Sequence, residues 1–326
     1  MTAASVPWQR EYEALVQTTG LVDLGHRTQI ELRGDDRATF LHNLCTNEIR
    51  KLPAGAGCEA FITSVQGKTL AHGFIFVDAQ SIVFDTSPGQ GERLLAHFDH
   101  YLVSEQVTLA DQSSQCSELL LSGPTADEVL QKAGAARLAA SRLAHQHVEI
   151  GGRAVWARRV DLVGPQGILL SAASPDEEAV RATIESAGAV PCGGAAFEAA
   201  RVEWGFPVFG QDITESNLPQ EVARDSQAIS YVKGCYLGQE TVARIDALGH
   251  VNQTLVALRF AAEAMPTAGL ELTAEARKVG HVTSAAYSPR LGRWCGLGYV
   301  RRGSNLPGST LGSAAGPVEV VKPPAS

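Results

Sequence analysis

The feature that most constrains the fold of this chain is a change in its hydrophobic pattern near residue 250. Before this point, segments with alternating apolar residues are interleaved with segments of helical spacing. After it, short apolar segments such as "VNQTLVALRF" and "GPVEVVKPP" are separated by glycines and show hardly any helical period. A chain of 326 residues also exceeds what one hydrophobic core usually fills. The sequence therefore predicts several packed units, the last of them a small β-barrel or β-sandwich.

The first 250 residues predict α+β units with largely antiparallel sheets. The segment 28–34, "TQIELRG", alternates like a strand, and 59–78 holds two apolar segments around the turn signal "QGK", which is typical of a hairpin. The clearest helix is 174–188, "SPDEEAVRATIESAG", in which Ser174 is expected to cap the start and Gly188 to end the helix. Strands and helices in this order favour an α+β fold class.

Composition excludes several classes of function. The formal net charge of −8 gives no basic footprint for nucleic acid, so we expect no direct contact with it. No run approaches 18 apolar residues and the N-terminus lacks the apolar core of a signal peptide, so we expect a cytoplasmic protein without a membrane partner. The six cysteines include no C-x-x-C pair; we expect them to be reduced and predict no metal site.

The stretch "KGCYLGQET" places Cys235 between Gly234 and Gly238, two residues after Lys233. A thiolate would be favoured near a lysine and near the N-terminus of the helix that "GQETVARIDALG" predicts. A free cysteine in a cytosolic protein is more often a small buried hydrophobic residue. The residues alone leave both interpretations open.

Four segments of the chain resemble a known family. "KGCYLGQE" resembles the K-G-C-[FY]-x-G-Q-E motif of the YgfZ proteins, folate-binding relatives of the glycine cleavage T protein that are linked to iron-sulfur cluster assembly or repair. The segments 20–49, 201–221 and 279–292 are similar to three further motifs of that family, in the same order. The resemblance therefore spans nearly the whole chain.

The resemblance implies a three-domain arrangement around a central channel that holds tetrahydrofolate. It combines two mixed α/β units with a C-terminal β-barrel, which agrees with the α+β prediction made from the hydrophobic pattern. On this basis, residues 1–240 are expected to form the folate-binding region, and residues 241–326 the barrel. The two subdomains of the first region are expected to divide near 110–120, and the chain can weave between them.

The resemblance also implies site residues. Glu203 falls where the family grips the pterin ring, and a carboxylate can accept two hydrogen bonds from the amino and ring N–H groups of a pterin. Lys233 is expected near the pterin or the glutamate tail, and Asn47 and His26 to line or brace the channel. Arg201 shares the segment with Glu203 and is either a ligand contact or a structural partner of a carboxylate. Without the family, "RVEWG" would be interpreted as an ordinary strand, and Asn47 as a helix C-cap.

One segment departs from the T proteins, which carry an acidic pair in "G-G-I-x-D-D". The matching stretch here is "GKTLAH", so Ala71 and His72 replace the two aspartates. An imidazole does not supply the fixed negative charge that steadies an iminium-like centre. His72 is either a structural histidine or a base for another reaction. The nearby Asp78 and Asp85 are expected to be turn acids at strand ends.

Three functional hypotheses follow. The first is a tetrahydrofolate-binding accessory protein of the YgfZ type, in which Cys235 acts as a redox thiol, a nucleophile or a ligand to a transient iron-sulfur cluster shared with a partner. Its partners would be iron-sulfur assembly proteins or client iron-sulfur enzymes, with tRNA modification affected only indirectly. The second is a folate-dependent aminomethyltransferase, and the third a one-carbon demethylase-type enzyme. The sequence leaves open whether the chain has catalytic turnover.

Overall fold

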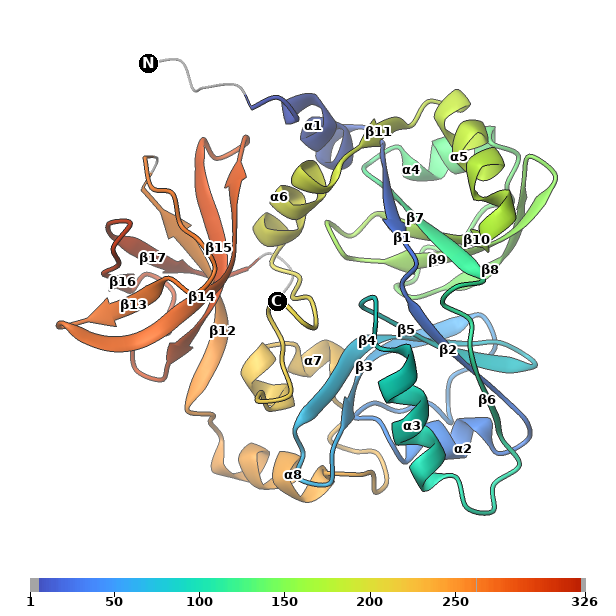
Figure 1. The fold of residues 1–326 in the computed structure, drawn as a ribbon, viewed down its shortest axis with the longest axis horizontal. Helices are drawn as coiled ribbons and strands as arrows, with labels where there is room; N and C mark the ends of the chain where they lie inside the picture. Colours follow the sequence, from blue (N-terminus) through green and yellow to red (C-terminus); the bar gives the residue numbers. More distant parts are fainter. Residues whose placement is uncertain (1–5, 262, 324–326) are drawn as a thin grey trace.

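A five-stranded antiparallel sheet forms the lower right part of the molecule in Figure 1. The computed structural model describes residues 6–261 and 263–323. The strand order is β3 (Ala56–Thr63), β4 (Thr69–Val77), β5 (Ser81–Thr86), β2 (Thr28–Arg33) and β6 (Thr108–Asp111). The helices α2 (Arg37–His42) and α3 (Gly91–Tyr101) pack on one face, where Phe40 and Phe98 meet Ile30 and Phe84 in a buried core. The predicted strand at 28–34 and hairpin at 59–78 are confirmed.

The second sheet has six strands and is covered on both faces. Its order is β11 (Val190–Cys192), β1 (Gly20–Gly25), β7 (Cys116–Ser122), β10 (Gly167–Ala173), β9 (Arg153–Val160) and β8 (His145–Ile150), with β1 and β11 parallel. Alternate strand residues face opposite sides: Leu119 and Leu121 pack under α4 (Ala126–Lys132) and α5 (Glu177–Ser186), whereas Leu120 packs toward α1 (Gln9–Gln17) and α6 (Gly194–Trp204).

The chain passes from one sheet to the other and back. β1 lies in the six-stranded sheet, the next strands β2 to β6 form the five-stranded sheet, and β7 returns to pair with β1. A buried network joins the two sheets: Arg27 contacts Asp85 at 2.6 Å and Glu118 at 3.1 Å, and Arg158 contacts Glu118 at 3.1 Å. The expectation that Asp85 is a turn acid is therefore wrong, because this residue is fully buried within β5.

The C-terminal sheet curves into a nearly closed antiparallel barrel, at the left of Figure 1. Its order is β13 (Glu271–Ala274), β14 (Arg277–Ser288), β15 (Arg293–Arg301), β12 (Gln253–Phe260), β17 (Val318–Val321) and β16 (Thr310–Leu311). A bridge between Thr273 and Gly312 brings the two edges together. The prediction of an α+β fold with two mixed units and a C-terminal barrel is confirmed.

Short elements link these units, and two helices elsewhere in the chain differ from the sequence predictions. The segment 206–252 carries η2 (Pro219–Val222), α7 (Asp225–Ala228) and α8 (Gln239–Leu248). The helix predicted from Ser174 begins with a 3-10 turn, η1 (Ser174–Asp176), and the Ser174 hydroxyl donates to the carbonyl of Ser114 instead of capping the helix. "RVEW" is the last turn of α6, so its interpretation as a strand is wrong. None of the described helices is long and apolar enough to cross a membrane.

Candidate functional site

Glu203 lies on the last turn of α6, where three distant segments meet. Gly205 ends the helix in the left-handed conformation with φ 91°. The Glu203 carboxylate accepts hydrogen bonds from the Tyr12 hydroxyl at 2.7 Å, from the Ser288 hydroxyl, and from Arg290 Nε at 2.6 Å. Burial, and then the hydrogen bond to Glu203 and its charge, raise the pKa of Tyr12, so its phenol remains a donor. The carboxylate is held by α1 and by the turn after β14, with only 10% of its side chain exposed.

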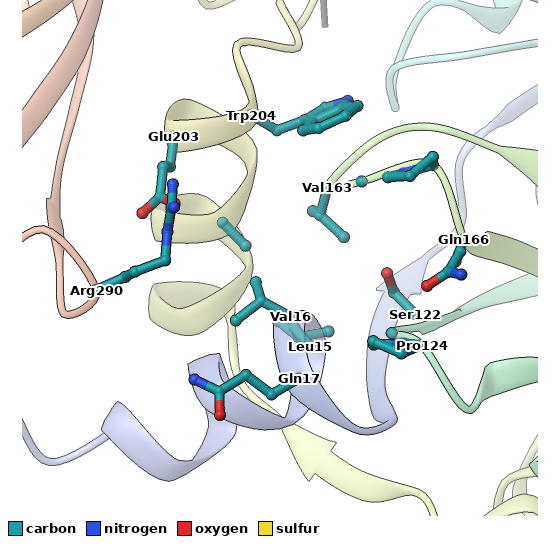
Figure 2. A pocket seen from close by; sticks show the side chains of 14 residues that line it. Leu15, Val16, Gln17, Ser122, Pro124, Val163, Gln166, Glu203, Trp204 and Arg290 are labelled. Atoms are coloured by element: carbon teal, nitrogen blue, oxygen red, sulfur yellow. The ribbon is translucent and has the colours of Figure 1, made fainter. Parts of the chain in front are cut away.

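A pocket of about 400 Å³ lies beside Glu203. Figure 2 shows Glu203 next to Arg290, while Trp204 extends from the same helix toward the loop that carries Val163. The indole Nε1 of Trp204 is buried and has no hydrogen-bond partner among the described residues. The volume suits a small ligand, and an aromatic ring with its own acceptor would satisfy that donor.

These residues fit a pterin, with one adjustment. A carboxylate has about four acceptor positions, and those of Glu203 are taken up by Tyr12, Ser288 and two nitrogens of Arg290. The Arg290 side chain is 56% exposed, so it is the partner that can move most easily. A pterin that contacts Glu203 through two N–H groups would therefore displace Arg290 and keep the other two donors.

Lys233 points into the fold and not toward this pocket. Its ammonium group donates to the carbonyl oxygens of His42 at 2.6 Å, Cys45 at 2.7 Å and Asn47 at 2.8 Å, and the residue is 6% exposed. These carbonyls belong to the C-terminal end of α2 and the loop that follows it. Burial lowers the pKa of Lys233, although Cys45 and Glu48 counteract this effect. All three donors of the ammonium group are used within the chain.

Cys235 is exposed, and it lies on a loop that hydrogen bonds of Lys233 fix before it and hydrogen bonds of Leu237 fix after it. The Leu237 amide donates to the carbonyl of Asn43 at 2.8 Å, and the Leu237 carbonyl accepts from the Thr63 hydroxyl at 2.6 Å. The interpretation of Cys235 as a buried hydrophobic residue is therefore wrong. The sulfur near the Lys233 ammonium is that of Cys45, at 3.9 Å, so the structure does not support the expected activation of Cys235 by Lys233.

Arg201 has a structural position. The residue is fully buried and donates to Asp212 at 2.8 Å, to the carbonyl of Phe206 at 2.6 Å and to the Ser284 hydroxyl at 2.9 Å. It also pairs with Glu198 one turn earlier in the helix. Arg201 thus connects α6 to β14 of the barrel, as the structural interpretation of this residue requires.

Asn47 and His26 lie at junctions between elements. The Asn47 amide donates to the carbonyls of Glu59 at 2.8 Å and Gln227 at 3.0 Å, which joins β3 to α7. Asn47 is not a helix C-cap, because α2 ends at His42. His26 is exposed, and its Nδ1 lies 2.9 Å from the carbonyl oxygen of Cys116. The structure thus separates the predicted residues: Lys233 and Asn47 lie together at the end of α2, away from the partners of Glu203.

A buried charge cluster lies around His72 in β4. Its Nε2 is 2.7 Å from Glu59 Oε1, and Glu59 also accepts from Arg224 at 2.6 and 2.8 Å and from Arg142. Glu59 is fully buried. Burial alone would raise the pKa of Glu59, but Arg224 and then His72 outweigh burial and hold this pKa well below its ordinary value. The carboxylate is therefore an anion whose charge is already neutralised by its neighbours.

Comparison with known proteins identifies the family to which this architecture belongs. Residues 2–226 match the family described as "GCVT N-terminal domain", and residues 253–325 match the "Glycine cleavage T-protein C-terminal barrel domain". The chain belongs to the glycine cleavage T-protein family. Its fold agrees, since an aminomethyltransferase T of the glycine cleavage system from Bartonella henselae superposes with a TM-score of 0.86 over 97% of this chain and 89% of its own, at 19% identity.

Two relatives show how far the sequence similarity extends along the chain. "Putative transferase At1g60990, chloroplastic" from Arabidopsis thaliana is 29% identical over 296 residues, which cover 89% of this chain and 67% of the relative. An aminomethyltransferase from Rubrobacter xylanophilus is 27% identical over 293 residues, covering 89% and 78% of the two chains. This chain is therefore similar to aminomethyltransferases over most of its length.

Several residues that contact Glu203 or His72 in this T-protein family member were not predicted from the sequence. Ser288 and Arg290 lie in the segment 279–292 that resembles the family, so the segment was a signal, although no role was assigned to them. Tyr12 gave no signal, because it occupies an ordinary apolar position of α1. Glu59 was hidden in an apolar strand, 165 positions before its partner Arg224. Within residues 6–261 and 263–323, no group of three His, Cys, Asp or Glu side chains could hold a metal ion.

Proposed function

We propose that this T-protein family member is a tetrahydrofolate-binding accessory protein of the YgfZ type, which acts in iron-sulfur cluster assembly or repair through the thiol of Cys235. The observation that carries the proposal is the exposure of Cys235 on a fixed loop, while Lys233, two residues before it, donates to three backbone carbonyls of the chain and not to a ligand. A thiol held accessible in this way can react with a partner or bind iron.

The residues at the T-protein acid position support the same proposal. Ala71 is fully buried, and His72 is 3% exposed and bound to Glu59. The nearby Glu59 carboxylate is thus paired with two arginines and hydrogen-bonded to His72, and it offers little uncompensated negative charge to an iminium-like centre. Because a cluster usually needs about four ligands, an iron-sulfur cluster would be cargo shared between Cys235 and a partner.

The folate part of the proposal depends on the pocket beside Glu203. Trp204 would supply an aromatic surface and a free N–H, and Glu203 would accept from the amino and ring N–H groups of the pterin. Tetrahydrofolate would bring a reduced pterin that carries one-carbon groups. The chain's own residues would bind and orient this ring, with Tyr12 and Ser288 fixing the carboxylate.

Aminomethyl transfer is the second candidate, because the matched relatives include aminomethyltransferases. It requires an acid other than the pair that Ala71 and His72 replace. Purified protein would separate the two candidates through turnover with tetrahydrofolate and an aminomethylated lipoyl carrier protein. Rapid turnover that persists in Cys235→Ser would favour the transferase and overturn the proposal.

The main test is complementation of a bacterial strain that lacks its own YgfZ, with the activity of an iron-sulfur enzyme as the readout. We expect the wild-type chain to restore this activity and Cys235→Ala to lose it. Cys116→Ala is the matched control, because Cys116 is also a free cysteine but is only partly exposed. Anaerobic tetrahydrofolate binding by Glu203→Ala tests the pocket separately, and unchanged affinity would exclude the proposed pterin contact.

A further inference from the structure

A second pocket, of about 450 Å³, lies where the linking segment meets the barrel. It is bounded by η2 and α7, by the C-terminal end of α8, by the start of β12 and by the loop after β15. It shares no lining residue with the pocket beside Glu203. The proposed function does not involve this pocket.

Two buried acceptor atoms line this pocket without partners. Asp225 Oδ1 and Gln220 Oε1 have no hydrogen-bond partner in the part of the chain that the structure describes. Gln220 is only 7% exposed, and its Nε2 donates to the carbonyl of Val242 at 2.7 Å. This bond fixes the orientation of the amide, so the free atom is the carbonyl oxygen. Buried acceptors are normally satisfied, and both of these require a donor.

The pocket also carries negative charge that the fold does not balance. Asp225, which is half-buried, and Asp246, which is exposed, both line it, and neither forms an ion pair with another described residue. Burial, and then Asp246, raise the pKa of Asp225 to about 6. Burial, followed by Asp225 and Asp246, also raises the pKa of Tyr231, and a hydrogen bond with the Gln220 side chain partly counteracts this effect. The two basic side chains of the lining, Arg302 and His250, are exposed.

We propose that this pocket binds the ammonium group of a small aliphatic primary amine. An ammonium group has three donors and no acceptor, which matches Asp225 Oδ1, Gln220 Oε1 and the Asp246 carboxylate. The apolar part of the lining, Ile245, Val251 and Leu306, suits a short aliphatic chain. A hydroxyl would satisfy one acceptor at most and would leave the carboxylate charge unbalanced.

The test is an NMR titration of the isotope-labelled full chain with n-butylamine, n-butanol and tetramethylammonium. We expect saturable shifts from residues of this pocket with n-butylamine at millimolar concentration, and none with the alcohol or with the cation that lacks N–H donors. Nα-acetyl-lysine methylamide is the fourth probe. If it binds and n-butylamine does not, the ammonium group comes from a lysine of another protein, and the free-amine proposal is overturned.

Substitutions of the two aspartates test whether their carboxylates bind the ammonium group of n-butylamine. Asp225→Asn should weaken n-butylamine binding about tenfold or more, because a charge-assisted hydrogen bond to a buried carboxylate is lost. Asp246→Asn should weaken it as well, whereas Asp35→Asn, at an exposed acid in the five-stranded unit, should leave it unchanged. No saturable shift in the wild-type chain, or equal affinity in Asp225→Asn, would overturn the proposal. Tetrahydrofolate is absent throughout, so the result is independent of the proposed folate site.

Discussion

Replacing Asp225 with Asn should stabilise the fold at neutral pH, which is unusual for a change at a mostly buried residue. Asp225 holds a buried carboxylate oxygen without a partner, next to the negative charge of Asp246. Asn has nearly the same shape and carries no charge. The substitution therefore removes an unfavourable charge without creating a cavity.

The size and the sign of this change in stability follow from the pKa of Asp225, which is raised from its ordinary value of 3.8 to about 6. Between these values the folded state binds more protons than the unfolded state, so wild-type stability falls as pH rises through this window. One pKa unit corresponds to about 1.4 kcal/mol, and partial exposure reduces the effect. We expect Asp225→Asn to gain about 1–3 kcal/mol in the free energy of unfolding above pH 6, and nothing below pH 4.

Urea unfolding of both proteins in steps from pH 4 to pH 8 would measure this difference. Other titrating groups are common to the two proteins, so they cancel in the difference between them. Asp35→Asn serves as the control, since Asp35 is exposed, and its difference curve should be flat. A difference curve for Asp225→Asn that is also flat, or that shows destabilisation at pH 8, would refute the assignment of unbalanced charge to this pocket.

Three further predictions concern the other buried charges and the rim of the pocket beside Glu203. Lys233→Met should cost about 3–5 kcal/mol, because three buried carbonyls lose a charged donor, and it should accelerate labelling of Cys235 by a thiol reagent. Glu59→Gln should lower the free energy of unfolding by about 3–5 kcal/mol at pH 7. Because the pKa of Glu59 is depressed, the stabilisation by its carboxylate is fully present above pH 4.5 and is lost only at strongly acidic pH. The urea midpoints of both proteins across this pH range would show the difference. Arg290→Ala should change stability by less than about 1 kcal/mol, as expected for a half-exposed pair, and should increase tetrahydrofolate affinity in anaerobic equilibrium dialysis by freeing Glu203.

The sequence predicted the fold class because the hydrophobic pattern is set locally. The strand at 28–34 and the hairpin at 59–78 have clear alternation, and the glycine-separated segments after residue 250 form the barrel. The last turn of α6 was misread because "RVEW" is too short to show a period. Its helical state depends on the alanines before it and on the left-handed Gly205 after it.

The charged clusters could not be predicted, because they depend on contacts between distant segments. Asp85 looked like a turn acid, but the pairing of β2 with β5 brings Arg27 beside it, and the return of β7 to β1 brings Glu118 to the same arginine. Glu59 likewise meets its partner Arg224 only when α7 packs against β3. The sequence shows which residues can carry a charge, but the pairing of these charges is a property of the tertiary structure.

The structure assigns different tasks to the residues of "KGCYLGQE". Lys233 holds the loop through three carbonyls. Gly238 adopts φ 81°, and a Cβ there would lie 2.4 Å from the Ser64 carbonyl oxygen, so the loop can approach β3 only with glycine at this position. Tyr236 is buried against the Lys233 ammonium, 4.8 Å from its ring centre. Cys235 is exposed, and its thiol makes no hydrogen bond within the described chain. Packing therefore explains the lysine, the tyrosine and the second glycine but not the cysteine, whose exposed thiol is the group to which the proposed function assigns chemistry with a partner.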